Sequence, residues 1–249
     1  MSNEYVPMKA LVRGLVDSTL FTAPGQLRTT RYIPRKLRRA VGSYHAYKHW
    51  ADIALTVAAQ FPDGDYFEFG SSGFNTLRNF LSALHLYRDI DPDMKFFTFD
   101  AFGEYDGQGE EQPYFQVYKN LGTSFYERAM RRLRRHGIAF NQIEITKGYF
   151  ADTLTDALKQ RLKAERRRAG FAFLDCSMAA SYETCFGFLE DFVTDRAFVY
   201  VDEYFQIPGV AEAFEKFRNV VCQRHGLVAR YVRDCGGFGA LFVFNKSPQ

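Results

Sequence analysis

Acidic residues lie at or near the ends of four separate hydrophobic runs of this chain, at Glu68, Asp100, Asp175 and Asp202. Each run is short and rich in Phe, Tyr or Val, which is typical of buried strands. The carboxyl ends of parallel strands share one edge of a sheet, and ligands of open α/β sheets bind at that edge. Carboxylates there can hold sugar hydroxyls, a cationic group or a divalent cation. The pattern therefore predicts one acidic ligand site assembled from distant parts of the chain.

The first of these runs, residues 65–73, ends in a glycine turn, E-F-G-S-S-G. Gly70 leaves room for a ligand to lie against the backbone at the start of a helix, with Ser71 beside it. Glu68 stands where the dinucleotide fingerprint G-x-G-x-x-G has its leading glycine. A carboxylate at this position would repel a pyrophosphate but suits a cationic group. We therefore expect a cationic, nucleotide-like cofactor at Glu68, Gly70 and Ser71; a simple solvated strand-to-helix turn is the alternative.

The next two strand ends supply partners for a nucleoside. Asp100 follows the second strand, where Rossmann-like sites hold a ribose diol on one carboxylate. Phe102 comes two residues later, and Tyr149 and Phe150 follow Gly148 after the third strand. These aromatic side chains are predicted to bind the cofactor, with Tyr149 and Phe150 forming a flat slot for an adenine ring. As core aromatics they would need no ligand.

Three carboxylates, Asp175, Asp202 and Glu203, follow the fourth and fifth strands. Oxygen ligands of this kind suit Mg²⁺. Carboxylates that lie close together are costly unless a cation or a proton lies among them. We expect either a metal bound by these three residues or a catalytic acid and base at Asp175 and Asp202, with Asp175 also touching the cofactor. The alternative is that the carboxylates cap the following helices and bind water.

The bulk composition is that of an ordinary globular domain. The chain has 249 residues, of which 47% are hydrophobic and 24% charged, and its net charge is +3. Residues 1–60 are predicted to form a helical and basic appendage that could cover the active site, and residues 61–249 one domain. The arginine-rich stretch at 28–39 is typical of a solvated face, so a nucleic-acid partner is disfavoured. The chain has four cysteines without a C-x-x-C pair, and it shows neither a signal peptide nor a long apolar run. We therefore expect a cytoplasmic protein with no membrane contact.

Strand and helix patterns alternate along the chain, which predicts a mostly parallel sheet with helices on both faces. The two last strands, 227–233 and 238–244, are too close for anything but an antiparallel hairpin. Seven strands with one reversed resemble the Rossmann-like sheet of the class I S-adenosylmethionine-dependent methyltransferases. The expected elements are strands 66–70, 96–100, 141–146, 171–175 and 197–201 and helices 43–60, 74–88, 113–135, 152–168, 181–193 and 208–224.

Motifs across residues 64–218 resemble the macrocin O-methyltransferase (TylF-like) family of sugar O-methyltransferases. The resemblance implies a cofactor, S-adenosylmethionine, against the first two strand ends, and Mg²⁺ on Asp175, Asp202 and Glu203 that orients a sugar hydroxyl. The motifs are Glu68-Phe-Gly70, Phe99-Asp100-Ala-Phe102-Gly103, Lys147-Gly-Tyr-Phe-Ala-Asp-Thr-Leu154, Asp175-Cys176 with Tyr182, and Asp202-Glu-Tyr204 with Pro208-Gly-Val210 and Ala213.

The chain departs from the family pattern beside the expected metal ligands. Ser177 stands where the family has a second Asp, Ala179 where it has Tyr, and Glu203 where it has Asp. Without a metal, a protein base would be needed, for which His225 is a further candidate. These departures keep open a catalytically inactive methyltransferase-like binding or partner subunit. A nucleotide-dependent oxidoreductase is a weaker alternative, because Glu68 and the terminal hairpin count against it.

The leading prediction is an S-adenosylmethionine-dependent O-methyltransferase of natural product biosynthesis. Its substrate would be a hydroxyl of a small metabolite, with sugar-bearing compounds as the class that the resemblance favours. A homo-oligomer is compatible with the sequence.

Overall fold

The structure of the chain is a computed structural model that describes residues 48–60, 63–87, 90–102, 123–133, 140–235 and 238–246. Most of the predicted appendage, including the arginine-rich stretch, lies outside these residues. Of the helix expected at 43–60, the described part is α3 (Lys48–Ala59). Whether residues 1–60 form a separate unit therefore stays a prediction.

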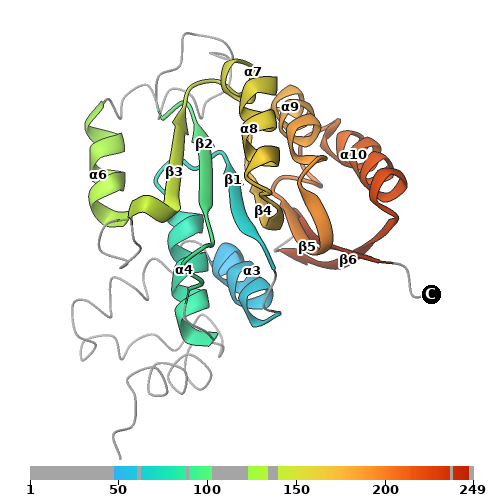
Figure 1. Cartoon of the computed structure of the whole chain (residues 1–249), viewed down its shortest axis with the longest axis horizontal. Coiled ribbons are helices and arrows are strands. Elements are labelled where there is room, and N and C mark those ends of the chain that lie inside the picture. The colour runs from blue at the N-terminus through green and yellow to red at the C-terminus, as the bar shows by residue number, and fades with distance from the viewer. Residues whose placement is uncertain are drawn as a thin grey trace, which may run out of the picture.

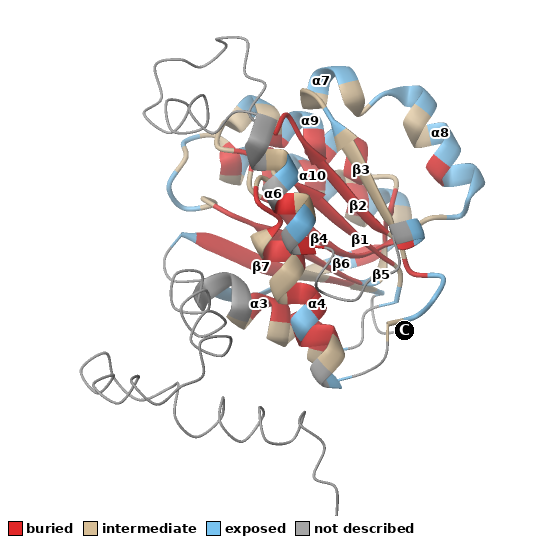
Figure 2. Ribbon diagram, turned by 90° about the vertical axis from the view of Figure 1, so that its left-hand side faces the viewer, coloured by how far each residue is buried: buried red, intermediate tan, exposed pale blue. Residues whose placement is uncertain are grey.

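Seven strands form one sheet in the order β3-β2-β1-β4-β5-β7-β6, with β7 labelled in Figure 2 and the others in Figure 1. The first five strands along the chain run parallel, and β7 pairs antiparallel with both β5 and β6. This confirms the predicted class I methyltransferase sheet with its reversed strand. The bounds are β1 (Asp65–Phe69), β2 (Phe96–Asp100), β3 (Ile143–Lys147), β4 (Ala169–Leu174), β5 (Val193–Val201), β6 (Leu227–Cys235) and β7 (Gly239–Lys246).

Helices cover both faces of the sheet, as the alternating pattern predicts (Figures 1 and 2). On one face, α3 packs with α4 (Asn75–Tyr87) and α6 (Thr123–Leu133) over one hydrophobic cluster. On the other face, α8 (Asp156–Ala164), α9 (Ala179–Leu189) and α10 (Val210–His225) pack over a second cluster. The strands are therefore held between two apolar layers.

Phenylalanine builds much of this double core. Every residue of β1 and β2 is buried, because parallel strands covered on both faces have no solvent side. Successive side chains still alternate, so Tyr66 joins the cluster under α4 while Phe67 and Phe69 join the cluster under α9. The rings of Phe69 and Phe99 stack with centroids 5.1 Å apart across β1 and β2. This packing fixes the strands whose ends carry the acidic residues.

The helix expected at 152–168 is two helices, α7 (Phe150–Thr153) and α8, so that prediction was wrong. The break comes at Leu154 and Thr155, since Thr155 is extended and its side chain accepts the N–H of Leu158 at 3.2 Å. Thr155 therefore caps α8.

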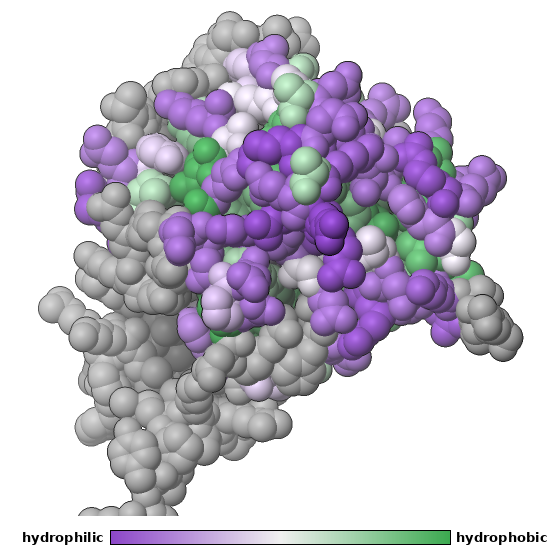
Figure 3. Space-filling model, viewed as in Figure 1, coloured by the Kyte–Doolittle hydropathy of each residue, from purple (hydrophilic) through white to green (hydrophobic). Residues whose placement is uncertain are grey.

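The face of the molecule in Figure 3 is mainly hydrophilic in its described part, and its apolar side chains show only as small separate areas. None of the described helices is long and apolar enough to span a membrane.

Candidate functional site

Backbone hydrogen bonds extend the parallel ladders past the strand ends and so bring the acidic residues to one edge. The N–H of Gly70 donates to the carbonyl of Phe99 at 2.9 Å, and the N–H of Asp175 donates to that of Phe69 at 2.8 Å. Asp202 N–H donates likewise to the Leu174 carbonyl at 2.8 Å. The predicted gathering of distant residues at one edge is therefore what the fold produces. We call Glu68, Asp100, Asp175, Asp202 and Glu203 the acidic edge.

The glycine turn after β1 packs directly against the end of β4. Gly70 has φ +89°, and a Cβ built on it would lie 1.8 Å from the carbonyl oxygen of Asp175. Ser71 is buried beside it. Only glycine combines this φ with such a close backbone approach. The turn after β1, where the cofactor is expected, therefore contacts the backbone of Asp175, one of the two expected catalytic residues.

Asp100 links the turns that follow β1 and β2. Its carboxylate accepts the N–H of Ser72 at 2.8 Å and the N–H of Phe102 at 2.5 Å. Burial raises the pKa of Asp100, and these two donors lower it in part. Sequence reasoning assigned Asp100 to a ribose diol and missed this second role. Each carboxylate oxygen has a further lone pair, so one residue can hold both the turns and a hydroxyl.

Glu68 lies fully buried one residue before the end of β1. It is opposite Thr98 in the β1–β2 register. Within the described part of the chain, neither carboxylate oxygen of Glu68 has a partner with full hydrogen-bond geometry, and the same holds for the hydroxyls of Thr98 and Tyr66. Burial, and then the nearby Asp100 and Asp175, hold the pKa of Glu68 well above its usual range. The hydroxyl of Ser71 and the N–H of Leu77 lie near the carboxyl group and lower its pKa only in part. A buried carboxyl group without partners is stable only when it is neutral or when a cationic group reaches it.

Asp175 and Asp202 lie side by side after β4 and β5. Burial first, and then Asp202, Glu203 and Asp100, raise the pKa of Asp175 well above its usual value. Asp202 is held by two tyrosines that sequence reasoning did not assign to the site: the hydroxyl of Tyr200 donates to its Oδ1 at 2.6 Å, and the hydroxyl of Tyr182 donates to its main-chain carbonyl at 2.7 Å. The position of Tyr182, seven residues after Asp175, was a signal in the sequence for this contact. Tyr200 gave no such signal, because it resembles the other aromatic residues of the strands.

The structure does not support the expected Mg²⁺ site. Within the described ranges, no group of three His, Cys, Asp or Glu side chains is arranged to hold a metal ion. Asp202 directs one oxygen to Tyr200, and Glu203 takes a left-handed φ of 54° with its Oε2 buried and without a hydrogen-bond partner. The carboxylates of Asp175, Asp202 and Glu203 thus interact electrostatically, but their positions do not fit one shared cation.

The aromatic residues of the expected adenine slot divide into two groups. Phe102 is buried between Phe74 and Tyr126, with ring centroids 5.3 and 4.9 Å away. Tyr149 and Phe150 are half-buried at the start of α7, where the ring of Phe150 meets the edge of Phe69 at 6.3 Å. Phe102 therefore shapes the core beneath the site, while Tyr149 and Phe150 lie nearer to solvent.

His225 does not join the acidic edge. It is the last residue of α10, where Gly226 takes the left-handed cap, and its Nε2 lies 3.0 Å from the carbonyl oxygen of Glu190. Because α10 starts after the carboxyl end of β5 and runs back along the sheet, its last turn lies at the opposite end. The suggestion that His225 is the base is therefore not supported.

A family model for macrocin O-methyltransferases (TylF) matches residues 93–228, which run from β2 to the start of β6. A comparison with curated protein sequences found no match. Solved structures share the fold. CalS11, a calicheamicin methyltransferase, has a TM-score of 0.58 at 15% identity over 97% of this chain and 87% of its own. The O-methyltransferase NovP has 0.54 at 18% identity over 80% and 79%. TomG from Streptomyces achromogenes, an O-methyltransferase involved in tomaymycin synthesis and solved with S-adenosylmethionine, has 0.54 at 15% identity over 87% and 91%.

Proposed function

The chain belongs to the macrocin O-methyltransferase (TylF) family and is an S-adenosylmethionine-dependent methyltransferase, and from this premise we propose that it methylates a hydroxyl group of a small metabolite. Sugar-bearing natural products are the acceptor class that the family favours. A calicheamicin methyltransferase and an O-methyltransferase involved in tomaymycin synthesis share the fold, which supports a natural product as the acceptor.

The observation that carries the cofactor assignment is the fully buried carboxyl group of Glu68, which has no well-aligned hydrogen-bond donor, below the turn at Gly70. A cationic ligand in that turn would supply the missing interaction. We propose that the cofactor lies against Gly70 and Ser71, with its diol on Asp100. Tyr149 and Phe150 would flank its adenine, with Phe102 behind them.

When bound, S-adenosylmethionine supplies a methyl group on a positively charged sulfur, so the protein has mainly to orient the acceptor and take up its proton. In its ionised form Asp175 is suited to accept the proton, because its surroundings raise its pKa and so make the carboxylate a stronger base. Asp202, fixed by Tyr200 and Tyr182, would orient the acceptor hydroxyl. No step in this proposal passes through a metal.

The non-catalytic alternative finds no support in the comparisons. The departures that suggested it lie just before and at the start of α9, where Ser177 takes a left-handed φ of 60° and Ala179 is the first helical residue. We propose that Ser177 and Ala179 change which acceptor the enzyme binds. The two proposed catalytic residues, Asp175 and Asp202, are kept.

The test combines binding with turnover. Calorimetry should show that S-adenosylhomocysteine binds the wild type and binds Asp100→Ala at least ~10-fold more weakly, since a bidentate charged contact is lost. Incubation with S-adenosylmethionine and a panel of glycosylated phenols and nucleotide sugars should give products heavier by one methylene group. Asp175→Asn should retain binding and lose roughly 10²-fold or more in turnover.

Asp156→Asn, an exposed acid in the first turn of α8, is the matched control and should change neither quantity. Absence of cofactor binding by the wild type would contradict the proposal. Binding without transfer to any panel member would instead favour a binding subunit.

A further inference from the structure

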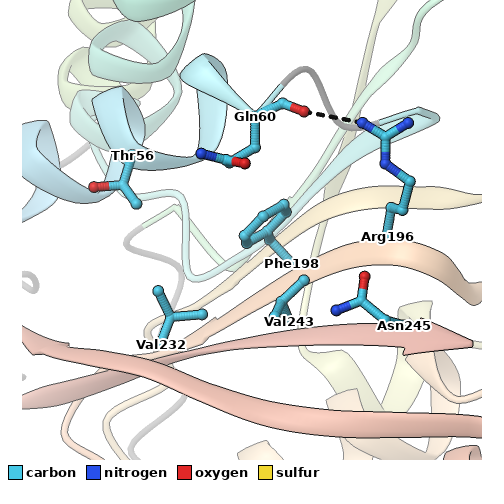
Figure 4. Close-up of a pocket in the computed structure, with 7 residues that line it drawn as sticks. All are labelled: Thr56, Gln60, Arg196, Phe198, Val232, Val243 and Asn245. Carbon is cyan, nitrogen blue, oxygen red and sulfur yellow. Dashed lines mark hydrogen bonds between the residues drawn. The ribbon is translucent and has the colours of Figure 1, made fainter. Parts of the chain in front are cut away.

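A pocket of about 270 Å³ lies between α3 and strands β5, β6 and β7 (Figure 4). Its wall on the helix side comes from Thr56 and Gln60. The strands contribute the remaining side chains, which are Arg196, Phe198, Val232, Val243 and Asn245. Arg196 belongs to the first half of β5, whereas Asp202 follows the last residue of that strand. The pocket and the acidic edge are therefore separate places in the fold.

A register irregularity in β5 and a one-residue β-bulge in β6 lie at this pocket, which we call the bulge pocket. Between the pairs Ala169–Val193 and Phe171–Phe198, one residue of β4 faces four residues of β5, at 194–197. In β6, Val232 is the extra residue between pairs that involve Tyr231 and Arg233. Bulges re-aim individual side chains and are common next to functional sites. Here the two irregularities, on different strands, bring Arg196 and Val232 to the same hollow.

Arg196 is also held in an uncommon backbone conformation. Its φ is +65°, a value that favours glycine. Its guanidinium donates to the carbonyl of Gln60 at 3.2 Å and lies 3.8 Å from Asp63 Oδ2. Both side chains of this ion pair are more than half exposed, at 53% and 68%, so the pair is weak. Backbone strain of this kind is concentrated at ligand-binding sites.

The lining has a definite chemical character. Arg196 is the one charged side chain of the lining, and its carboxylate neighbour Asp63 lies outside the lining and is more than half exposed. In the described part of the chain, the side-chain amides of Gln60 and Asn245 make no hydrogen bond. Phe198, Val232 and Val243 supply an apolar floor on the sheet, as Figure 4 shows. Cationic, polar and apolar groups thus meet in one small volume.

We propose that the bulge pocket binds a small carboxylate with an apolar body, separately from the cofactor and its acceptor. The guanidinium of Arg196 holds the carboxylate, because its fork of donors matches a planar anion. The body of the ligand lies on Phe198 and Val243, and the amides of Gln60 and Asn245 bind its polar substituents. The pocket volume is at the small end of ligand sites, which limits the ligand to about the size of a substituted benzoate.

Benzoate is the probe for this proposal, and its neutral isostere benzamide is the comparator. A ligand of this size should bind with a Kd on the order of 1 mM. Calorimetry and NMR of the full chain should show saturable benzoate binding, with shifts of side-chain amide signals that Gln60→Ala and Asn245→Ala assign. Benzamide should bind at least ~10-fold more weakly, since the charge-assisted contact is absent.

Two variants test the location in different ways. Arg196→Gln removes the cation, and Val232→Trp fills the hollow; each should weaken benzoate binding at least ~10-fold. Arg230→Gln, an exposed arginine of β6 outside the lining, should leave benzoate binding unchanged. S-adenosylhomocysteine affinity should stay within about twofold in all three, which shows that the variants are folded and that the sites are separate.

No saturable benzoate binding would overturn the proposal. Binding that both Arg196→Gln and Val232→Trp leave intact would overturn the location, and equal binding of benzamide would overturn the assignment to an anion.

Discussion

The acidic edge and the bulge pocket are built from the same sheet in opposite ways. At the acidic edge, the ladders continue in register past the ends of β1, β4 and β5, and they deliver carboxylates side by side. At the bulge pocket the ladders are interrupted, and the inserted residues supply an arginine and a valine. One site is acidic and has three buried carboxylates, Glu68, Asp100 and Asp202, whereas the other has a single cation in its lining.

The difference teaches that regular and irregular pairing give different kinds of site. In-register strand ends place corresponding positions side by side. Here these positions carry carboxylates, which raise one another's pKa, as Asp175 shows. A bulge places one side chain at a time, so residues of unlike chemistry meet, as Arg196 and Phe198 do. Substitutions at each place should therefore have different consequences.

The largest effect is expected where the acidic edge depends on close backbone contact. Gly70→Ala should lower the free energy of unfolding by at least about 3 kcal/mol and abolish measurable cofactor binding. The new Cβ would overlap the carbonyl of Asp175, and φ +89° is unfavourable for alanine. Urea unfolding and calorimetry with S-adenosylhomocysteine measure the two quantities.

Gly187→Ala is the matched control. Gly187 is an exposed residue of α9, and a Cβ there would contact nothing within 4 Å. This change should stabilise the protein by about 0.5 to 1 kcal/mol. Equal changes in the free energy of unfolding of Gly70→Ala and Gly187→Ala would mean that the close approach of the turn to the end of β4 does not hold the acidic edge in place.

A smaller loss is expected when the support of Asp202 is removed. Tyr200→Phe deletes the hydroxyl that donates to Asp202 Oδ1 at 2.6 Å, and it should cost about 1 to 3 kcal/mol of stability. The methyl-transfer rate should fall more than the cofactor affinity, because Asp202 is proposed to orient the acceptor. Tyr231→Phe, which changes an exposed tyrosine of β6, should stay within about 0.5 kcal/mol. Equal losses in the two variants would remove Tyr200 from the site.

The pH dependence of stability tests the burial of Glu68. In the unfolded chain this group loses its proton near the ordinary glutamate pKa of 4.5, whereas the folded protein keeps the proton to higher pH. Its stabilising contribution is therefore complete below the unfolded pKa and is lost as the pH rises toward the folded pKa. Over that window the wild type should lose up to about 1.4 kcal/mol per pH unit relative to Glu68→Gln.

Urea unfolding of the cofactor-free proteins at several pH values between about 5 and 8 measures this difference. Parallel curves for the two proteins would mean that Glu68 is ionised and satisfied in the fold. Added S-adenosylhomocysteine, which has an ammonium group, should reduce the difference if that group reaches Glu68.

The sequence predicted much of the acidic edge and nothing of the bulge pocket, for a physical reason. Asp100, Asp175 and Asp202 follow strands with clear patterns, and parallel strands place their ends together whatever the details of packing. The unmet prediction, a metal on Asp175, Asp202 and Glu203, depended on side-chain directions, which Tyr200 and the left-handed turn at Glu203 decide. The role of Arg196 could not be predicted, because hydrophobic periodicity indicates regular strands and does not indicate where strand pairing is interrupted.

The smallest effect separates strain from function at the bulge pocket. Arg196→Gly relieves the positive φ of 65°, which costs a non-glycine residue about 1 to 2 kcal/mol, but glycine loses more entropy on folding by roughly 0.5 to 1 kcal/mol. The net gain in stability should be between zero and about 1.5 kcal/mol, measured by urea unfolding. Arg196→Gln is the matched control, since it also removes the guanidinium but keeps the strain, so it should lose benzoate binding without gaining stability.

A loss of stability in the glycine variant would mean that the contacts of Arg196 with Gln60 and Asp63 stabilise the bulge. The left-handed backbone of Arg196 would then be explained by contacts that stabilise the fold. Ligand binding would be the one remaining difference between the bulge pocket and the acidic edge.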